Sequence, residues 1–119
     1  MQPDALDHTM LALADPTRRA ILDRLQREGE TRVTDLAAPF PVSLNAVSKH
    51  IRLLERAALV RRRRVGREHF LAFNPSPLDA AAAWIEEKRA FWTNRLDALE
   101  RALSADDAKR NARRKGRKK

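Results

Sequence analysis

The sequence predicts a mainly α-helical fold with one small β-hairpin, in the order helix, helix, short strand, helix, helix, strand, strand, helix. Three segments carry this prediction. Residues 43–57 have apolar side chains spaced three and four apart, as in an amphipathic helix. Residues 59–73 are rich in β-branched and aromatic side chains on both sides of Gly66, as in a hairpin. Residues 78–104 contain neither Gly nor Pro and have an apolar stripe, which predicts one long helix.

The first two helices have clear start signals. Asp4 precedes an apolar spacing that predicts a helix over 5–14. Asp15 followed by Pro16 is typical of a second helix start, because Asp accepts hydrogen bonds at an N-cap and Pro fits the first helical position. Gly29 is expected to end this second helix.

The middle of the chain alternates short elements with turn residues. Residues 32–33 have room for at most one short strand. Thr34 is expected to cap a helix of one to two turns, which Pro39 and Pro41 end. Ser43 is expected to cap the amphipathic helix that follows.

The polar face of the 43–57 helix suggests contact with DNA. Two helices joined by a tight turn, with a polar face on the second, are typical of a helix-turn-helix. The basic hairpin that follows, at 59–73, then has the position of a wing, whose cations can contact phosphates. Side chains of this kind on the helix are Asn45, Ser48, Lys49, Arg52 and Arg56, and those on the wing are Arg61, Arg62, Arg63, Arg64 and Arg67.

The last helix is expected to begin at Ser76 and Pro77 and to need a second chain. At 1.5 Å per residue, residues 78–104 span about 40 Å, which is longer than one side of a domain of this size. Part of the apolar stripe is therefore left for another molecule to cover. Trp84 and Phe91 lie beside that stripe.

The net charge of +9 is concentrated in two blocks. Residues 45–67 carry eight basic and one acidic group, and residues 109–119 carry eight basic and none acidic. Such blocks favour a polyanion as partner. Because residues 105–119 contain no apolar group larger than Ala, we expect a domain over 1–104 and a basic, disordered tail over 105–119.

Several classes of function are disfavoured. The absence of Cys excludes disulfides and thiolate sites. No secretion signal or membrane span is recognisable, so we expect a cytoplasmic, nucleoid-associated protein without membrane contact. His8, His50 and His69 are too widely spaced to indicate a metal site, and no catalytic motif is present, so we predict no enzyme, no metal and no cofactor.

Several short motifs point to a known family: Leu13-Ala14-Asp15-Pro16-Thr17-Arg18-Arg19, Ile21-Leu22, Val47-Ser48-Lys49-His50 with Leu54, and Leu59-Val60. In this order and spacing, they make residues 8–103 resemble an ArsR-family winged-helix repressor. The resemblance implies a dimeric transcription factor that binds double-stranded DNA, with its recognition helix in the major groove.

Carried over by residue, the resemblance adds Ser43 and His50 to the DNA contacts at Asn45, Ser48 and Lys49. It also implies that the first and last helices form the dimer interface. On this chain, their candidate interface residues are Leu6, Met10, Ile85, Phe91, Trp92, Leu96, Leu99 and Leu103.

The sequence also departs from this family. Metal-sensing members have cysteines where this chain has Arg32 and Thr34, and the last helix lacks the His of the other common sensor site. Leu44 stands where many relatives have a polar residue. Ala58 stands where Gly commonly ends the recognition helix, so that another helix ending is expected.

These observations favour a homodimeric, sequence-specific repressor that binds a palindromic operator through the 43–57 helix and the 59–73 wing. The sequence does not decide whether a small-molecule effector regulates the protein. One alternative is a sequence-tolerant nucleoid-type or RNA-binding protein that uses the basic wing and tail. A second alternative is an interaction module whose long helix holds a different protein.

Overall fold

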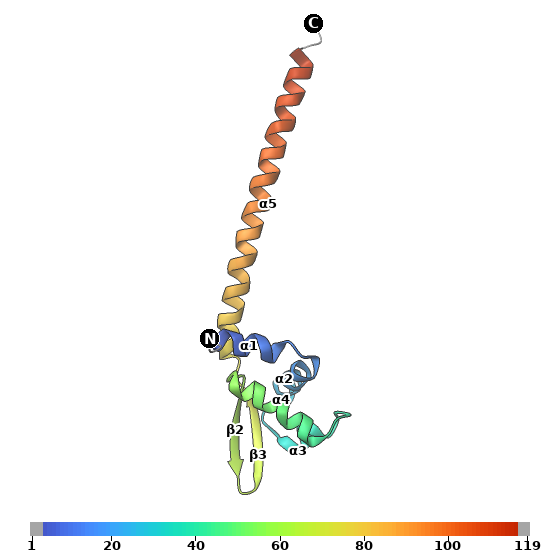
Figure 1. Ribbon diagram of the computed structural model, residues 1–119, viewed down its shortest axis with the longest axis vertical. Coiled ribbons are helices and arrows are strands. Elements are labelled where there is room, and N and C mark those ends of the chain that lie inside the picture. Colours follow the sequence, from blue (N-terminus) through green and yellow to red (C-terminus); the bar gives the residue numbers. More distant parts are fainter. Residues whose placement is uncertain (1–3, 117–119) are drawn as a thin grey trace. The chain divides into compact units, whose positions relative to one another are not determined.

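The computed structural model describes residues 4–116, which fall into two compact units, one up to Ala82 and one from Ala83 onward. The first unit contains four helices, a small sheet and the start of the last helix (Figure 1). The elements are α1 (Ala5–Leu13), α2 (Pro16–Glu28), β1 (Thr31–Arg32), α3 (Val33–Ala37), α4 (Leu44–Arg56), β2 (Val60–Val65), β3 (Glu68–Phe73) and α5 (Ser76–Gly116). This order confirms the predicted fold class.

The corner between α1 and α2 is fixed by side chains that bond to exposed backbone groups. Asp4 caps α1 in a reciprocal capping box with Asp7. Asp15 caps α2 by accepting a hydrogen bond from the Arg18 N–H at 3.1 Å. The Arg18 side chain is itself buried, and it donates from Nε to the Ala12 carbonyl and from Nη2 to the Leu11 carbonyl, both at 2.9 Å. Arg19 Nη1 donates to the Leu13 carbonyl at 2.7 Å, so two side chains of α2 satisfy the last carbonyls of α1.

Helix α3 begins two residues earlier than expected. Its N-cap is Arg32 without a side-chain capping bond, so the prediction that Thr34 caps this helix is wrong. The reason is that Arg32 also pairs with Phe70 in the sheet, and the chain turns into the helix directly after that pair. Ser43 does cap α4 as predicted, because its Oγ accepts from the Ala46 N–H at 3.1 Å.

Helix α4 ends in a left-handed residue, although that residue is alanine. Ala58 has φ +58°, the Leu59 N–H donates to the Leu54 carbonyl, and the Ala58 N–H donates to the Glu55 carbonyl. These two bonds form a Schellman motif, which usually has glycine at this position. The expectation that Ala58 would force another helix ending is therefore wrong. The Asn74 amide, which donates to the Ala58 carbonyl at 2.8 Å, helps to hold this strained residue.

The sheet has the order β1-β3-β2 and is antiparallel throughout. In the hairpin, Val60 faces Phe73 and Val65 faces Glu68, which leaves a two-residue turn in which Gly66 has φ +62°. A positive φ at the first turn position suits glycine and the twist of a hairpin. The predicted wing is therefore confirmed as a hairpin.

The core lies between α2, α3, α4 and the sheet. Helix α4 buries one stripe and packs against α1, α2 and β2 (Figure 1). The most deeply buried side chains are Ile21, Leu25, Leu36, Val47, Ile51, Leu54, Leu59 and Leu71. The alternating pattern of β3 contributes Leu71 to this core and leaves Phe70 on the opposite face of the sheet.

Helix α5 begins at Ser76, the residue expected to cap it, so it starts one residue before the expected first helical position at Pro77. The Ser76 N–H donates to the Asn74 side chain at 3.4 Å. It continues to Gly116, whereas the sequence predicts a disordered tail from residue 105. The residues from 105 to 115 include no Gly or Pro and are mostly Ala, Arg, Lys and Asp, and an Arg110–Asp106 ion pair joins two turns. Residues 117–119 of the predicted tail lie outside the described residues.

Among the residues that the structure describes, no helix has both the length and the apolar character that crossing a membrane requires.

Candidate nucleic-acid interface

The outer face of α4 carries a row of exposed polar side chains. Val47, Ile51 and Leu54 point into the core, and the opposite side of the helix exposes Asn45, Lys49, Arg52 and Arg56. Within the described residues, none of these four side chains has a hydrogen-bond or ion-pair partner, although three of them are cationic. Their donors are therefore available to base edges and phosphate oxygens.

Ser43 and Ser48 lie at the edges of this row. Ser43 is exposed, and its oxygen is already used to cap the helix. Ser48 is half-buried on the flank of α4 that faces the sheet, where it lines a cavity with Leu44. Ser43 therefore differs from the exposed row because its oxygen is engaged, and Ser48 differs because it is half-buried.

His50 is on the other flank of α4 and contacts the α1–α2 corner. Its Nδ1 lies 3.1 Å from Arg18 Nη1 and 3.8 Å from Asp15 Oδ2, and its side chain is only 23% exposed. The Arg18 backbone N–H, together with the nearby charges, lowers the pKa of Asp15 below its usual value. His50 thus joins α4 to the α1–α2 corner, which is a positioning role that differs from the exposed contact the resemblance implies.

The basic strand β2 presents its arginines on two faces. Arg62 and Arg64 share the face of Val60 and Leu71, whereas Arg61 and Arg63 share the face of Phe70. Arg62 binds Glu55 of α4 through Nε at 3.2 Å and Nη2 at 2.6 Å. This two-bond ion pair raises the pKa of Arg62 and fixes the wing to the recognition helix.

Arg63 is also held by a carboxylate. Its Nε and Nη2 donate to Glu30, and its guanidinium lies 5.4 Å from the centre of the Phe70 ring. The pair lowers the pKa of Glu30 and raises that of Arg63. On the same face of the sheet, Arg32 pairs with Glu68 and Asp35, which raise its pKa.

The other wing arginines, Arg61, Arg64 and Arg67, differ from Arg62 and Arg63 in having no carboxylate partner among the described residues. Each of the three is exposed. Arg64 donates from Nε to the Gly66 carbonyl at 2.8 Å, which leaves its other donors directed at solvent. The wing therefore has three cations available to an anionic partner and two that are engaged within the protein.

Two features of this site were not predicted. Arg18 was singled out only as part of a motif, and its burial between α1 and α4 has one sequence signal, its position three residues after the capping Asp15. The carboxylate partners Glu30 and Glu55 had no sequence signal, because they become neighbours of β2 only through folding.

The predicted dimer-interface residues occur in both units. In the first unit, Leu6 and Met10 on α1 are half-buried. In the second unit, the large apolar side chains of α5 are mostly exposed, namely Trp84, Ile85, Phe91, Trp92, Leu96, Leu99 and Leu103, with exposed fractions from 45% to 62%. Lys88 and Arg95 lie over the rings of Trp84 and Phe91.

Residues that replace the family's metal ligands have other roles here. Arg32 is in ion pairs, and Thr34 is an exposed residue at the edge of a cavity. In the described part of the chain, no cluster of three or more His, Cys, Asp or Glu side chains has the arrangement of a metal site.

A helix-turn-helix whose second helix exposes unpaired donors, followed by a basic antiparallel hairpin, defines a winged helix-turn-helix DNA-binding protein. Comparison with known proteins agrees. A family model described as a helix-turn-helix domain matches residues 13–63. An HTH-type transcriptional regulator of Mycobacterium tuberculosis is 36% identical over 100 residues, which cover 84% of this chain and 90% of the relative. The transcriptional repressor SdpR of Bacillus subtilis is 30% identical over 80 residues, with 67% and 88% covered.

Solved structures give the same result. An ArsR-family transcriptional regulator, RHA00566, is 40% identical with a TM-score of 0.71, and the match covers 77% of this chain and 94% of that one. An ArsR-like regulator from Rhodococcus is 33% identical with a TM-score of 0.75, with 85% and 92% covered. The chain therefore belongs to the ArsR family of transcriptional regulators, as its motifs predict. The names of its relatives also confirm the prediction that it is a DNA-binding regulator and not an enzyme.

Proposed function

We propose that this regulator is a homodimeric repressor that binds a palindromic operator with α4 in the major groove and the β2–β3 wing on the flanking backbone. The observation that carries the proposal is the exposed row of Asn45, Lys49, Arg52 and Arg56, whose donors have no partner within the described chain. An Asn side chain can pair with adenine through two hydrogen bonds, and Arg or Lys can do so with guanine. The three cations of the row also complement the phosphates.

The wing supports the same orientation. The ion pair between Arg62 and Glu55 and the packing of α4 on β2 place the hairpin next to α4. Arg61, Arg64 and Arg67 are exposed on this hairpin, and a wing with such cations can contact phosphates or the minor groove.

The second copy is inferred from α5. Its apolar residues follow a heptad spacing of four and three, at Leu78, Ala82, Ile85, Trp92, Leu96, Leu99 and Leu103, and Arg89 takes the one position that is missing from this series. Such a seam is typical of helices that pair with another helix. The series ends where Asp106 and Arg110 take the next two positions and form an ion pair with each other. A two-fold dimer is the commonest closed assembly, and it would match the two halves of a palindrome.

Sedimentation of the full chain at micromolar concentration tests the dimer. We expect a mass near two chains. A variant in which Trp92 and Leu99 are both replaced by Glu should sediment as a monomer whose first unit stays folded, as judged by the amide resonances of that unit. A monomeric wild-type chain would contradict the dimer and, with it, the palindrome.

Selection of bound fragments from genomic DNA, followed by titration, tests sequence recognition. We expect an affinity for the selected operator about a thousandfold or more above that for a scrambled duplex of equal length and salt. Equal affinities would support the sequence-tolerant alternative instead. Repression itself is tested with a reporter under the selected operator, whose expression should fall when the regulator is supplied and rise when Asn45 and Arg52 are replaced by Ala.

A further inference from the structure

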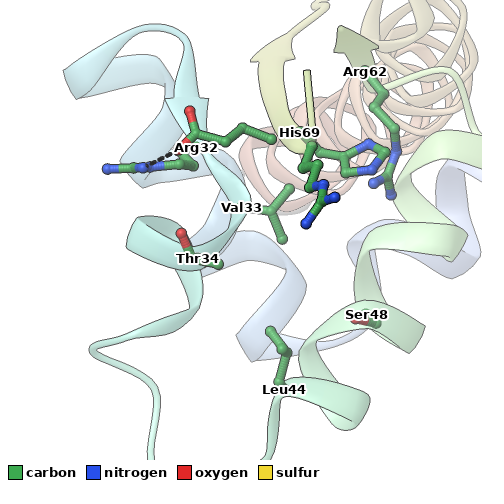
Figure 2. A pocket seen from close by; sticks show the side chains of 9 residues that line it. Arg32, Val33, Thr34, Leu44, Ser48, Arg62 and His69 are labelled. Atoms are coloured by element: carbon green, nitrogen blue, oxygen red, sulfur yellow. Dashed lines mark hydrogen bonds and ion pairs between the residues drawn. The ribbon is translucent and has the colours of Figure 1, made fainter. Parts of the chain in front are cut away.

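A cavity of about 470 Å³ lies between the start of α4, the short helix α3 and the wing. Its walls come from Val33 and Thr34 of α3, Leu44 and Ser48 of α4, and Arg62 and His69 of the hairpin, all within the first unit (Figure 2). This volume lies within the range of small-molecule sites, which combine apolar walls with a few fixed polar groups.

Two of the arginines that border the cavity are held by carboxylates. Arg62 is bound by two hydrogen bonds to Glu55, and Arg32, which also borders the cavity, is bound to Asp35 and Glu68. Such anchored guanidinium groups are preorganised, so that a ligand does not have to order them. Arg67, at the tip of the wing, borders the same space and has no ion pair among the described residues.

His69 is the least satisfied of these groups. Its ring lies beside the Arg62 side chain on the cavity wall (Figure 2), and its Nδ1 is buried without a hydrogen-bond partner. Buried polar atoms of folded proteins nearly always have a partner, which can be protein, water or a ligand. The Nδ1 of His69 therefore has a hydrogen-bonding capacity that no protein group among the described residues meets.

Apolar groups and charge together define the ligand. Leu44 is 54% exposed at the first turn of α4, where it lines the cavity together with Val33 and gives it an apolar wall. Arg32, Arg62 and Arg67 border the cavity with the carboxylate of Glu68. Arg32 and Arg62 are already paired with carboxylates, so Arg67 supplies the cation of the cavity that has no ion pair among the described residues. This combination suits an anion on an apolar body, since guanidinium groups recognise carboxylates and phosphates and the aliphatic wall accepts a ring or chain.

We propose that this cavity binds a small organic anion, a carboxylate or phosphate ester with a compact apolar body, and that the bound anion weakens DNA binding. The coupling rests on the proposed function, because Ser48 and Arg67 border the cavity and are also expected to contact DNA. An anion beside Arg67 neutralises a cation that the operator needs, and occupancy and DNA binding then oppose each other reciprocally. A DNA phosphate is the other source of the same anionic chemistry, and it lacks the apolar body.

Titration of the full-length protein without DNA tests the site. Benzoate and phenyl phosphate are the probes, inorganic phosphate represents the anion alone, and benzamide represents the apolar body alone. Nuclear magnetic resonance of the Ser48 amide and the His69 ring should show saturable shifts with at least one of the two organic anions in the micromolar to low millimolar range, and affinities at least about tenfold weaker for inorganic phosphate and benzamide.

Two variants locate the site. Arg67→Gln should lower the affinity for the probe by about tenfold. Arg61→Gln, which makes the same change at an exposed wing arginine outside the cavity, should leave that affinity unchanged. His69→Phe should abolish the saturable shifts at Ser48. Failure of both organic anions to bind, equal binding of inorganic phosphate, or unchanged binding by His69→Phe would overturn the proposal.

The coupling has its own measurement. The probe that binds should lower operator affinity by at least about threefold at saturation in the wild type, and should have no effect in His69→Phe, whose affinity for DNA without probe stays unchanged. A probe that binds and leaves operator affinity unaltered would overturn the coupling. A protein that binds no operator even without probe would refute the proposed function, while the probe titration would still decide the site.

Discussion

Arg63 and Arg64 are adjacent, and the structure predicts that only one of them contacts DNA. Arg63 is engaged by Glu30 through two hydrogen bonds and lies over Phe70, whereas Arg64 has no ion pair among the described residues. The replacements Arg63→Gln and Arg64→Gln remove the same charge from neighbouring positions. Any long-range effect of net charge on binding is therefore nearly the same, and the difference between the two variants isolates the direct contact.

The expected magnitude follows from counterion release. Each phosphate contact contributes about 0.9 to the slope of log affinity against log salt, so a contact made once by each of two protomers contributes about 1.8. Between about 50 mM and about 200 mM salt, a slope difference of that size changes the affinity ratio of wild type to variant by about tenfold. We expect this change for Arg64→Gln and less than half of the slope difference for Arg63→Gln.

Fluorescence anisotropy with operator and scrambled duplexes at several salt concentrations measures both slopes. Glu30→Gln is the matched third variant, because it releases Arg63 and should steepen the slope or leave it unaltered. If Arg63→Gln lowers the slope as much as Arg64→Gln does, then the ion pair with Glu30 opens on DNA and the distinction drawn between the two arginines is wrong.

Three further predictions concern stability and the tail. Ala58→Gly should stabilise the fold by about 1 kcal/mol, because an L-residue with positive φ is strained and glycine is not, and thermal unfolding should then shift upward by several degrees; an unchanged or lower midpoint would contradict the left-handed cap. Asp15→Ala should destabilise the fold at neutral pH, because hydrogen bonding lowers the pKa of Asp15 below its ordinary 3.8 in the folded protein. The stability difference between wild type and variant should be constant above pH 3.8 and should disappear as the pH falls through the folded pKa. If urea titrations give a stability difference that does not depend on pH, the carboxylate is not its cause. Truncation after Ala108 removes eight basic groups and should lower affinity for operator and scrambled DNA by similar factors with a shallower salt slope, and a loss confined to the operator would instead show that the tail reads sequence.

Local signals were sufficient to predict the order of elements. Asp15 with Pro16, Ser43, and Gly66 each act through bonds or dihedral angles within a few residues, and the structure has a helix start, a cap and a hairpin turn at these positions. Thr34 shows the limit of such signals. It has the side chain of a cap, but the pairing of Arg32 with β3 sets the start of α3 instead.

The sequence predicted which residues form the candidate site. It did not predict which of the arginines are paired with carboxylates and which are available to DNA. The exposed side of α4 follows from helical periodicity, so that Asn45, Lys49 and Arg52 were identifiable in advance. The state of the wing arginines depends on carboxylates at Glu30 and Glu55, which are 33 and 7 residues away along the chain. No pattern within the run of four arginines distinguishes those that fold against a carboxylate.

The contacts between helices α1, α2 and α4 could not be predicted from the sequence either. Arg18 was expected only as part of a motif, yet it is buried and joins the carbonyl end of α1 to His50 of α4. Buried arginine is rare, and its burial depends on acceptors that the folded corner supplies. The helical continuation from Ala105 to Gly116 was missed for a different reason, because charge and the lack of large apolar groups were weighted above the helix propensity of Ala, Arg and Lys.

The most direct test of the account measures how much operator preference depends on Asn45. The quantity is the ratio of affinities for the selected operator and a scrambled duplex, compared between wild type, Asn45→Ala and the control Gln26→Ala on the exposed side of α2. Loss of a base contact worth about 1 to 3 kcal/mol should lower this ratio by about fivefold or more in Asn45→Ala and leave it unaltered in Gln26→Ala. Equal losses of affinity for both duplexes in Asn45→Ala, with the ratio preserved, would contradict base reading by the exposed face of α4.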